Sequence, residues 1–105
     1  TLVEATVADA PLTLVPSHPV TLEADDARIG GTAGCNTYGA DYDLVGDEIR
    51  ITAPFSTMMM CEPADVMEVE MAFLSALESI ETVSTPDNSV VMSGPGITLR
   101  FAPAA

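Results

Sequence analysis

The sequence predicts a single α+β domain over residues 1–105, in which about eight short antiparallel strands form a barrel or half-barrel. Three observations carry this prediction. The length suits one domain, short runs rich in β-branched residues alternate with turn residues, and only one stretch has helical periodicity. A lone amphipathic helix must bury its apolar face against another element. We therefore expect the helix to pack across the open side of the sheet.

The expected strands are short apolar or alternating runs that end at Gly, Pro, Asp or Asn. They are residues 1–7, 12–15, 20–24, 27–33, 38–45, 48–52, 89–92 and 97–101, and residues 55–60 and 81–85 are expected to be further extended pieces. Gly46-Asp47 separates two alternating runs, which predicts a two-residue hairpin turn with a positive φ at its first position. Pro54 is expected to break the strand that follows this turn.

The helix is expected to begin at Pro63, because proline suits the first helical position. Asp65 lies in the first turn, where a carboxylate interacts favourably with the helix dipole. The apolar residues of the stretch fall on one face at 3.6 residues per turn. They are Val66, Val69, Phe73, Ala76, Leu77 and Ile80. Glu70 lies at the edge of this stripe, and we expect it to pair with one of Arg28, Arg50 or Arg100.

The net charge of −13 comes from sixteen acidic residues against three arginines, with no lysine. Such a field repels phosphate backbones and anionic lipids, so neither nucleic acid nor a membrane surface is an expected partner. No apolar run approaches the roughly eighteen residues of a membrane span, so this domain is not expected to insert. The chain begins at Thr1, and we expect a leader or lipid anchor upstream of an otherwise monomeric domain.

The two cysteines, Cys35 and Cys61, are open to two interpretations. They can be buried thiols that pack as small hydrophobes, or they can form a disulfide in an oxidising compartment. Their spacing is unlike a Cys-x-x-Cys redox motif. We favour a structural disulfide, which would stabilise the fold by roughly 3.5 kcal/mol through the loop it closes.

Candidate metal sites are not convincing in this sequence. Met58, Met59 and Met60 together with His18 suggest a copper(I) site, since thioethers are soft ligands. On a strand, however, Met59 points away from the other two, so core packing is the preferred interpretation. Asp41-x-Asp43 imitates the start of a calcium loop, but the positions that should supply later ligands do not. We expect no metal and no cofactor.

No catalytic arrangement is expected either, so the protein is not predicted to be an enzyme. Glu68 and Glu70 point about 160° apart on the helix, which does not suit a carboxylate pair. The single histidine, His18, lies between two prolines and has no evident nucleophile to activate.

A set of motifs resembles the META domain, a small bacterial envelope domain related to the heat-shock protein HslJ. The motifs are Gly34-Cys35-Asn36, Tyr42 with Gly46, Ile49-x-Ile51, Ser56-Thr57-x-Met59-x-Cys61, Met67-Glu68-x-Glu70 and Phe73-Leu74. The resemblance spans roughly residues 20–101 and implies a cracked antiparallel barrel with a helix. It also implies that Gly34, Asn36, Thr57, Met59 and Glu70 have structural roles.

Two positions depart from the family pattern. Family members usually carry a tryptophan in the opening strand, where this chain either lacks part of the strand or uses Leu2 instead. An Arg or Lys often precedes the family methionine, where Met58 stands here, so a positive charge is missing.

The resemblance implies a secreted protein or lipoprotein of the cell envelope, often linked to envelope stress, without established catalytic activity. We expect a non-catalytic extracytoplasmic domain that binds a protein partner. The alternative is a carrier for a small apolar ligand or lipid in the cavity of the half-barrel, suggested by six methionines and a high aliphatic content.

Overall fold

The computed structural model describes residues 1–15, 17–62 and 64–103, which form nine strands, one α-helix and a short 3-10 turn. The first strands and their bounds are β1 (Leu2–Val7), β2 (Ala10–Pro11), β3 (Glu23–Ala24), β4 (Arg28–Thr32), β5 (Thr37–Val45) and β6 (Glu48–Ser56). The helix α1 (Ala64–Leu77) follows, and then β7 (Thr82–Ser84), the 3-10 turn Pro86–Asn88, β8 (Val90–Gly94) and β9 (Ile97–Phe101).

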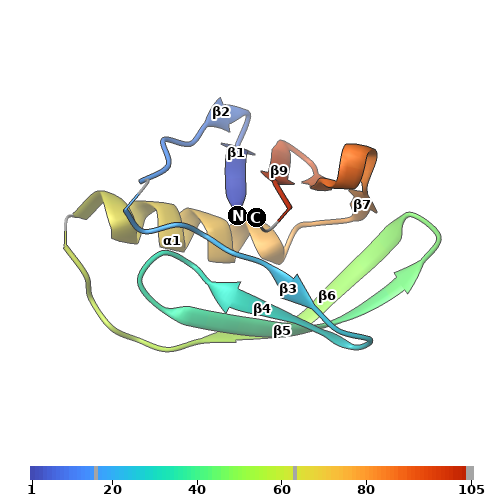
Figure 1. The fold of residues 1–105 in the computed structure, drawn as a ribbon, viewed down its shortest axis with the longest axis horizontal. Coiled ribbons are helices and arrows are strands. Elements are labelled where there is room, and N and C mark those ends of the chain that lie inside the picture. The colour runs from blue at the N-terminus through green and yellow to red at the C-terminus, as the bar shows by residue number, and fades with distance from the viewer. Residues whose placement is uncertain (16, 63, 104–105) are drawn as a thin grey trace.

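The strands form one antiparallel sheet in the order β2-β1-β9-β8-β7-β6-β5-β4-β3. The sheet bends around α1 without closing, with β1 and β9 on one side of the helix and β3 to β6 on the other (Figure 1). This arrangement confirms the expected half-barrel with a helix across it. The segment before β3 spans the gap between the two ends of the sheet, because Leu2 donates to the Val20 carbonyl at 2.7 Å and Thr21 to the Thr32 carbonyl at 2.8 Å.

The helix buries the apolar stripe that its sequence predicts. Its buried residues are Val66, Val69, Glu70, Phe73, Ala76 and Leu77, and Ile80 is buried just beyond its end. Phe73 is fully buried and meets the ring of Tyr38 edge-on at 5.0 Å and that of Phe101 at 6.2 Å. These contacts join the helix to β5 and β9, so the helix holds the two halves of the sheet together. The expected first helical residue, Pro63, lies outside the described residues.

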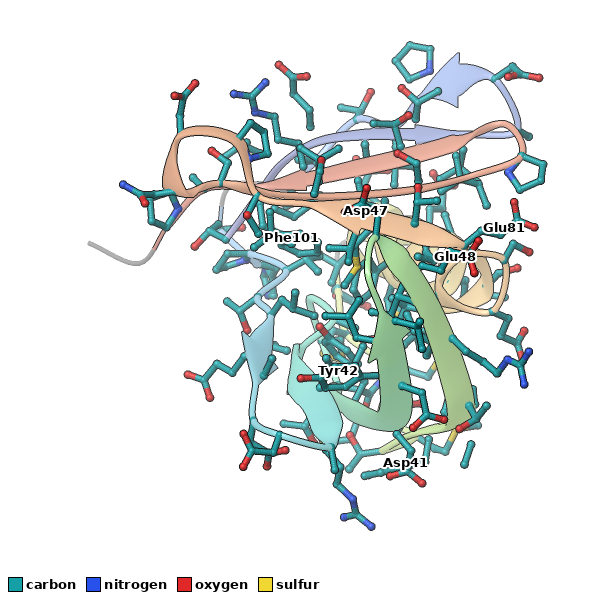
Figure 2. The ribbon with its side chains drawn as sticks, turned by 90° about the vertical axis from the view of Figure 1, so that its right-hand side faces the viewer. Asp41, Tyr42, Asp47, Glu48, Glu81 and Phe101 are labelled. Atoms are coloured by element: carbon teal, nitrogen blue, oxygen red, sulfur yellow. A yellow bond between two sulfur atoms is a disulfide. The ribbon has the colours of Figure 1, made fainter. Side chains whose placement is uncertain are left out.

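The β5–β6 hairpin has the predicted two-residue turn, and Gly46 adopts a φ of 62°. At this end β6 also meets β7. The amide of Ile49 donates to the Glu81 carbonyl at 3.0 Å, and that of Val83 donates to the Asp47 carbonyl at 2.9 Å. Figure 2 shows Asp47 and Glu48 close to Glu81 at this junction.

Three strand predictions were wrong in detail. Pro54 does not end β6, because a bulge at Ala53, with φ 51°, absorbs the irregularity and pairing resumes between Phe55 and Gly39. Pairing stops at Ser56, so residues 57–60 are not a strand. Residues 12–15 are also irregular, and the short strand β2 precedes them.

The opening strand, β1, has no tryptophan. β1 pairs with β9 from Leu2 to Thr6, and Leu2 is buried in the core. Leu2 therefore contributes an apolar side chain from this strand to the core.

Candidate functional site

The most specific arrangement in the molecule joins the turn between β4 and β5 to the segment that leads into α1. Cys35 and Cys61 form the expected disulfide, with Cα atoms 5.8 Å apart and the two residues 26 positions apart in sequence. Gly34, just before the first cysteine, has a φ of 109°, a backbone conformation that residues other than glycine rarely adopt. The turn therefore depends on a glycine and is held by a covalent bond to residue 61.

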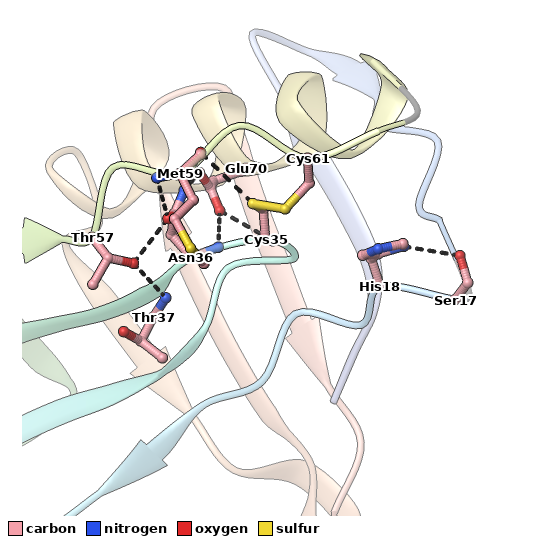
Figure 3. Close-up of a disulfide and its surroundings, with 9 residues drawn as sticks. All are labelled: Ser17, His18, Cys35, Asn36, Thr37, Thr57, Met59, Cys61 and Glu70. Atoms are coloured by element: carbon pink, nitrogen blue, oxygen red, sulfur yellow. Dashed lines mark hydrogen bonds between the residues drawn. A yellow bond between two sulfur atoms is a disulfide. The ribbon is translucent and has the colours of Figure 1, made fainter.

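A buried carboxylate from the helix binds the same turn (Figure 3). Glu70 is only 3% exposed. Its Oε1 accepts hydrogen bonds from the backbone amides of Cys35 at 3.2 Å and Asn36 at 2.6 Å, and its Oε2 accepts one from Asn36 Nδ2 at 2.5 Å. Three N–H donors thus replace the water that a carboxylate loses on burial.

This contact corrects the expectation that Glu70 pairs with an arginine. Arg28 binds Asp41 instead at 3.0 Å on the surface, and Arg50 and Arg100 are exposed. The physical reason is position: Glu70 faces the interior beside Val69 and Phe73, where exposed guanidinium groups do not reach. A carboxylate within a buried stripe was the signal that it needed a buried partner.

The side chain of Asn36 connects the helix to the segment after β6. Its Nδ2 donates to the Met59 carbonyl at 3.0 Å, and its Oδ1 accepts from the Met59 amide at 2.7 Å and the Thr57 hydroxyl at 2.8 Å. Thr57 Oγ1 in turn accepts from the Thr37 amide at 3.2 Å. Cys35, Asn36, Thr57, Met59 and Glu70 are called the Asn36 cluster below.

The Asn36 cluster uses every polar group it buries. Asn36 is 1% exposed, and no buried side-chain nitrogen or oxygen in the described part of the chain lacks a hydrogen-bond partner. Fully satisfied polar networks fix a unique geometry, since any shift leaves a buried group unpaired. Gly34, Asn36, Thr57, Met59 and Glu70 thus help to fix the path of the backbone at this turn. The structure brings all of them to one place.

The three methionines do not pack in the core, which corrects the preferred interpretation of the sequence. Met58, Met59 and Met60 are 90%, 59% and 84% exposed. The reason is that β6 ends at Ser56, so these side chains lie beyond the part of the sheet that covers the core. Together with Phe55, also exposed, they place four large apolar side chains within six residues on the surface.

The remaining candidate residues lie apart from this cluster. The ring of His18 contacts Ser17, with Nδ1 and Oγ 3.0 Å apart, and Figure 3 shows both away from the disulfide. Asp41 is occupied by Arg28, and Glu68 is exposed on the outer face of the helix. Among the residues that the structure describes, no three His, Cys, Asp or Glu side chains gather as a metal site would require.

The interior of the half-barrel is filled by side chains. Phe73, Leu77, Met92 and Leu99 are completely enclosed there. A hollow of about 930 Å³ lies outside it, as an open groove between the β5–β6 hairpin and the segment that follows α1. Glu48, Glu78 and Glu81 contribute to its lining.

The sequence matches the META domain family over residues 2–105. The chain belongs to the META domain family. The match includes the opening strand, so the whole described fold of this META domain is one family unit. No curated protein matches the sequence.

Two solved structures share the fold of this META domain. One is a protein from Burkholderia xenovorans solved by NMR, with 25% identity and a TM-score of 0.80 over 99% of this chain and 79% of that one. The other, also solved by NMR, has 19% identity and a TM-score of 0.67 over 93% of this chain and 86% of that one. The second likeness concerns the fold alone.

Proposed function

We propose that this META domain is a non-catalytic, extracytoplasmic domain that binds another protein, either secreted or lipid-anchored at the cell envelope and accessory to envelope stress. The observation that carries the proposal is the exposure of four large apolar side chains, Phe55, Met58, Met59 and Met60, within six residues. Exposed apolar side chains that gather on a protein surface commonly mark an interaction site. Methionine is well suited to one, because its flexible thioether adapts to different partners.

The backbone beneath these side chains is held in place, which favours binding over mere exposure. The side chain of Asn36 fixes both polar groups of Met59, and the disulfide fixes Cys61. A segment that is already ordered loses less conformational entropy when a partner binds. The anchored backbone at Met59 and Cys61 lowers the entropy lost on binding, and flexible thioethers can adapt to the partner.

The location is supported by the covalent chemistry. Structural disulfides persist in oxidising compartments and are rare in the cytosol. The single α-helix of the described residues is too short to cross a membrane. A secreted or peripherally anchored domain would have both properties.

The non-catalytic part of the proposal is supported by how the buried carboxylate is used. General acid–base catalysis needs a carboxyl group within hydrogen-bond reach of a substrate. Glu70 is instead enclosed, and both of its oxygens bind the turn. Its geometry suits a structural anchor.

The apolar-ligand alternative has less support than protein binding. Carriers enclose their ligands in cavities lined by apolar side chains. Here the space between helix and sheet is occupied by Phe73, Leu77 and Leu99, whereas the exposed apolar surface lies outside.

Site-specific photo-crosslinking tests the proposal. A photoreactive amino acid would replace Met58 in the full-length protein in its native cells, and Thr98, exposed on β9, would serve as the control position. We expect discrete protein adducts from position 58 and none of the same mass from position 98. Equal patterns at both positions would contradict a specific partner surface. A hydrolase activity that is lost in folded Glu70→Gln protein would contradict the non-catalytic role.

A further inference from the structure

The backbone of residues 57–60 has one bonded side and one open side. The Thr57 amide donates to the Thr37 carbonyl at 3.0 Å, and both polar groups of Met59 bind the side chain of Asn36. These alternate bonds continue the β5–β6 ladder beyond its last pair, Tyr38 with Ser56. In an extended chain the intervening residues direct their polar backbone groups the other way.

The intervening residues are Met58 and Met60. Within residues 1–15, 17–62 and 64–103, no hydrogen bond involves their backbone amides or carbonyls. Both residues are almost wholly exposed, so their backbone groups and side chains face solvent together. This row of free donors and acceptors has the character of an unpaired strand edge.

The open edge lacks the devices that usually protect one. Proline, bulges and lysine prevent an exposed strand edge from pairing with another chain. In β6 the bulge at Ala53 and the missing amide of Pro54 protect the preceding part of the chain. Residues 57–60 contain no proline, glycine or charge. The unprotected part of the edge is therefore the part that carries the methionines.

Charge indicates what kind of segment would pair here. The residues that follow the edge include Glu62, Asp65 and Glu68, all exposed, and the chain carries −13 overall with no lysine. Opposite charge speeds association and favours one partner over another. A second copy of this chain would bring another −13 to the same place and be repelled.

We propose that the partner binds by adding an extended strand along the open edge of Met58 and Met60, and that this strand alternates apolar residues with Lys or Arg. Main-chain hydrogen bonds to residues 58 and 60 supply affinity, and the thioethers contact the apolar side chains of the added strand. The inference rests on the proposed function and adds the mode of binding and the chemistry of the partner.

A defined peptide tests this mode of binding. The probe is a blocked octapeptide of alternating lysine and valine, titrated into ¹⁵N-labelled domain and followed by amide chemical shifts. We expect saturable shifts centred on residues 57–61. The same peptide with every backbone nitrogen methylated keeps its charge but loses its donors, and it should bind at least tenfold more weakly. Equal binding of the methylated peptide would reduce the interaction to charge and overturn the proposal.

A matched pair of variants separates backbone from side chain. Met60→Pro removes the outward amide, whereas Met60→Ala removes the thioether and keeps the amide. We expect about a tenfold loss of peptide affinity in Met60→Pro, as for one lost hydrogen bond, and less than about threefold in Met60→Ala. The Asn36 side-chain signals report that the cluster remains folded. Equal losses in both variants, or shifts that depend on protein concentration without peptide, would overturn the proposal.

The cross-linking experiment separates this inference from the proposed function. Specific adducts at position 58 combined with no peptide response would overturn the added strand and leave protein binding supported. Absence of both would count against both.

Discussion

The carboxylate of Glu70 accepts two hydrogen bonds from Asn36, one to Oε2 from Nδ2 at 2.5 Å and one to Oε1 from the backbone amide at 2.6 Å. The two residues are 34 positions apart and belong to the helix and to the turn before β5. The side-chain amide of Asn36 also hydrogen-bonds the backbone of Met59, through Nδ2 to the carbonyl and Oδ1 to the amide. One buried charge therefore positions the turn directly and the exposed methionines indirectly.

Glu70→Gln should lower the free energy of unfolding by about 3 kcal/mol. The amide that replaces one carboxylate oxygen would point a donor at another donor, and bonds to a charged acceptor would be lost. Urea unfolding measures the change, with Glu68→Gln on the exposed face of the same helix as the control, expected within about 0.5 kcal/mol of the parent. Similar values for both variants would contradict an anchoring role for Glu70.

Much of the fold followed from local patterns, because alternation and helical period report burial directly. The apolar stripe of α1, the Gly46 turn and the alternating β9 all appear where the sequence placed them. The disulfide was also expected, although the sequence left buried thiols as an alternative.

The contacts of the Asn36 cluster could not be derived in the same way. They join residues 36, 57, 59 and 70, and which distant polar groups meet depends on the path of the whole chain. The expected core packing of Met58 to Met60 was wrong, because β6 ends at Ser56 and the methionines lie beyond the part of the sheet that covers the core. Pro54 did not end β6 because pairing with β5 on both sides of the bulge at Ala53 outweighed the local preference of proline.

Removal of the disulfide should destabilise the domain by about 3.5 kcal/mol. The bond links residues 26 positions apart, so without it the unfolded chain gains conformational entropy. The Cys35→Ala/Cys61→Ala variant should unfold at the same urea concentration with and without a reducing agent. The parent protein should unfold at the same urea concentration as this variant only when its disulfide is reduced. A parent protein that is unaffected by reduction of the bond would show that the Asn36 cluster suffices to hold the turn.

Gly94→Ala should cost about 2–3 kcal/mol of stability. A Cβ at this position would lie 2.0 Å from the backbone carbonyl oxygen of Ser79, and backbone cannot move aside as a side chain can. Gly46→Ala is the comparison. Nothing lies within 4 Å of a Cβ there, so only its φ of 62° opposes the change, at about 1 kcal/mol. Thermal or urea unfolding of both variants gives the order, and a costlier Gly46→Ala would refute close packing between β8 and the end of the helix.

Stability should fall above pH 10 because of Tyr38. Burial raises the pKa of the Tyr38 phenol well above its ordinary value of 10, so the folded protein keeps the proton while the unfolded chain releases it. The contribution of Tyr38 is therefore complete below pH 10 and is lost as the pH rises toward the folded pKa, at up to about 1.4 kcal/mol per pH unit.

Tyr38→Phe separates this effect from general alkaline unfolding. The variant should lose about 1 kcal/mol at pH 8, because the Thr21 carbonyl no longer receives the phenol hydrogen bond that spans 2.7 Å. Its stability should then decline less steeply than that of the parent between pH 10 and pH 11, so the two curves approach each other. Urea unfolding at pH 8, 10 and 11 measures both slopes. Parallel curves would mean that the phenol is as accessible to hydroxide in the folded protein as in the unfolded chain, contrary to its burial against Phe73.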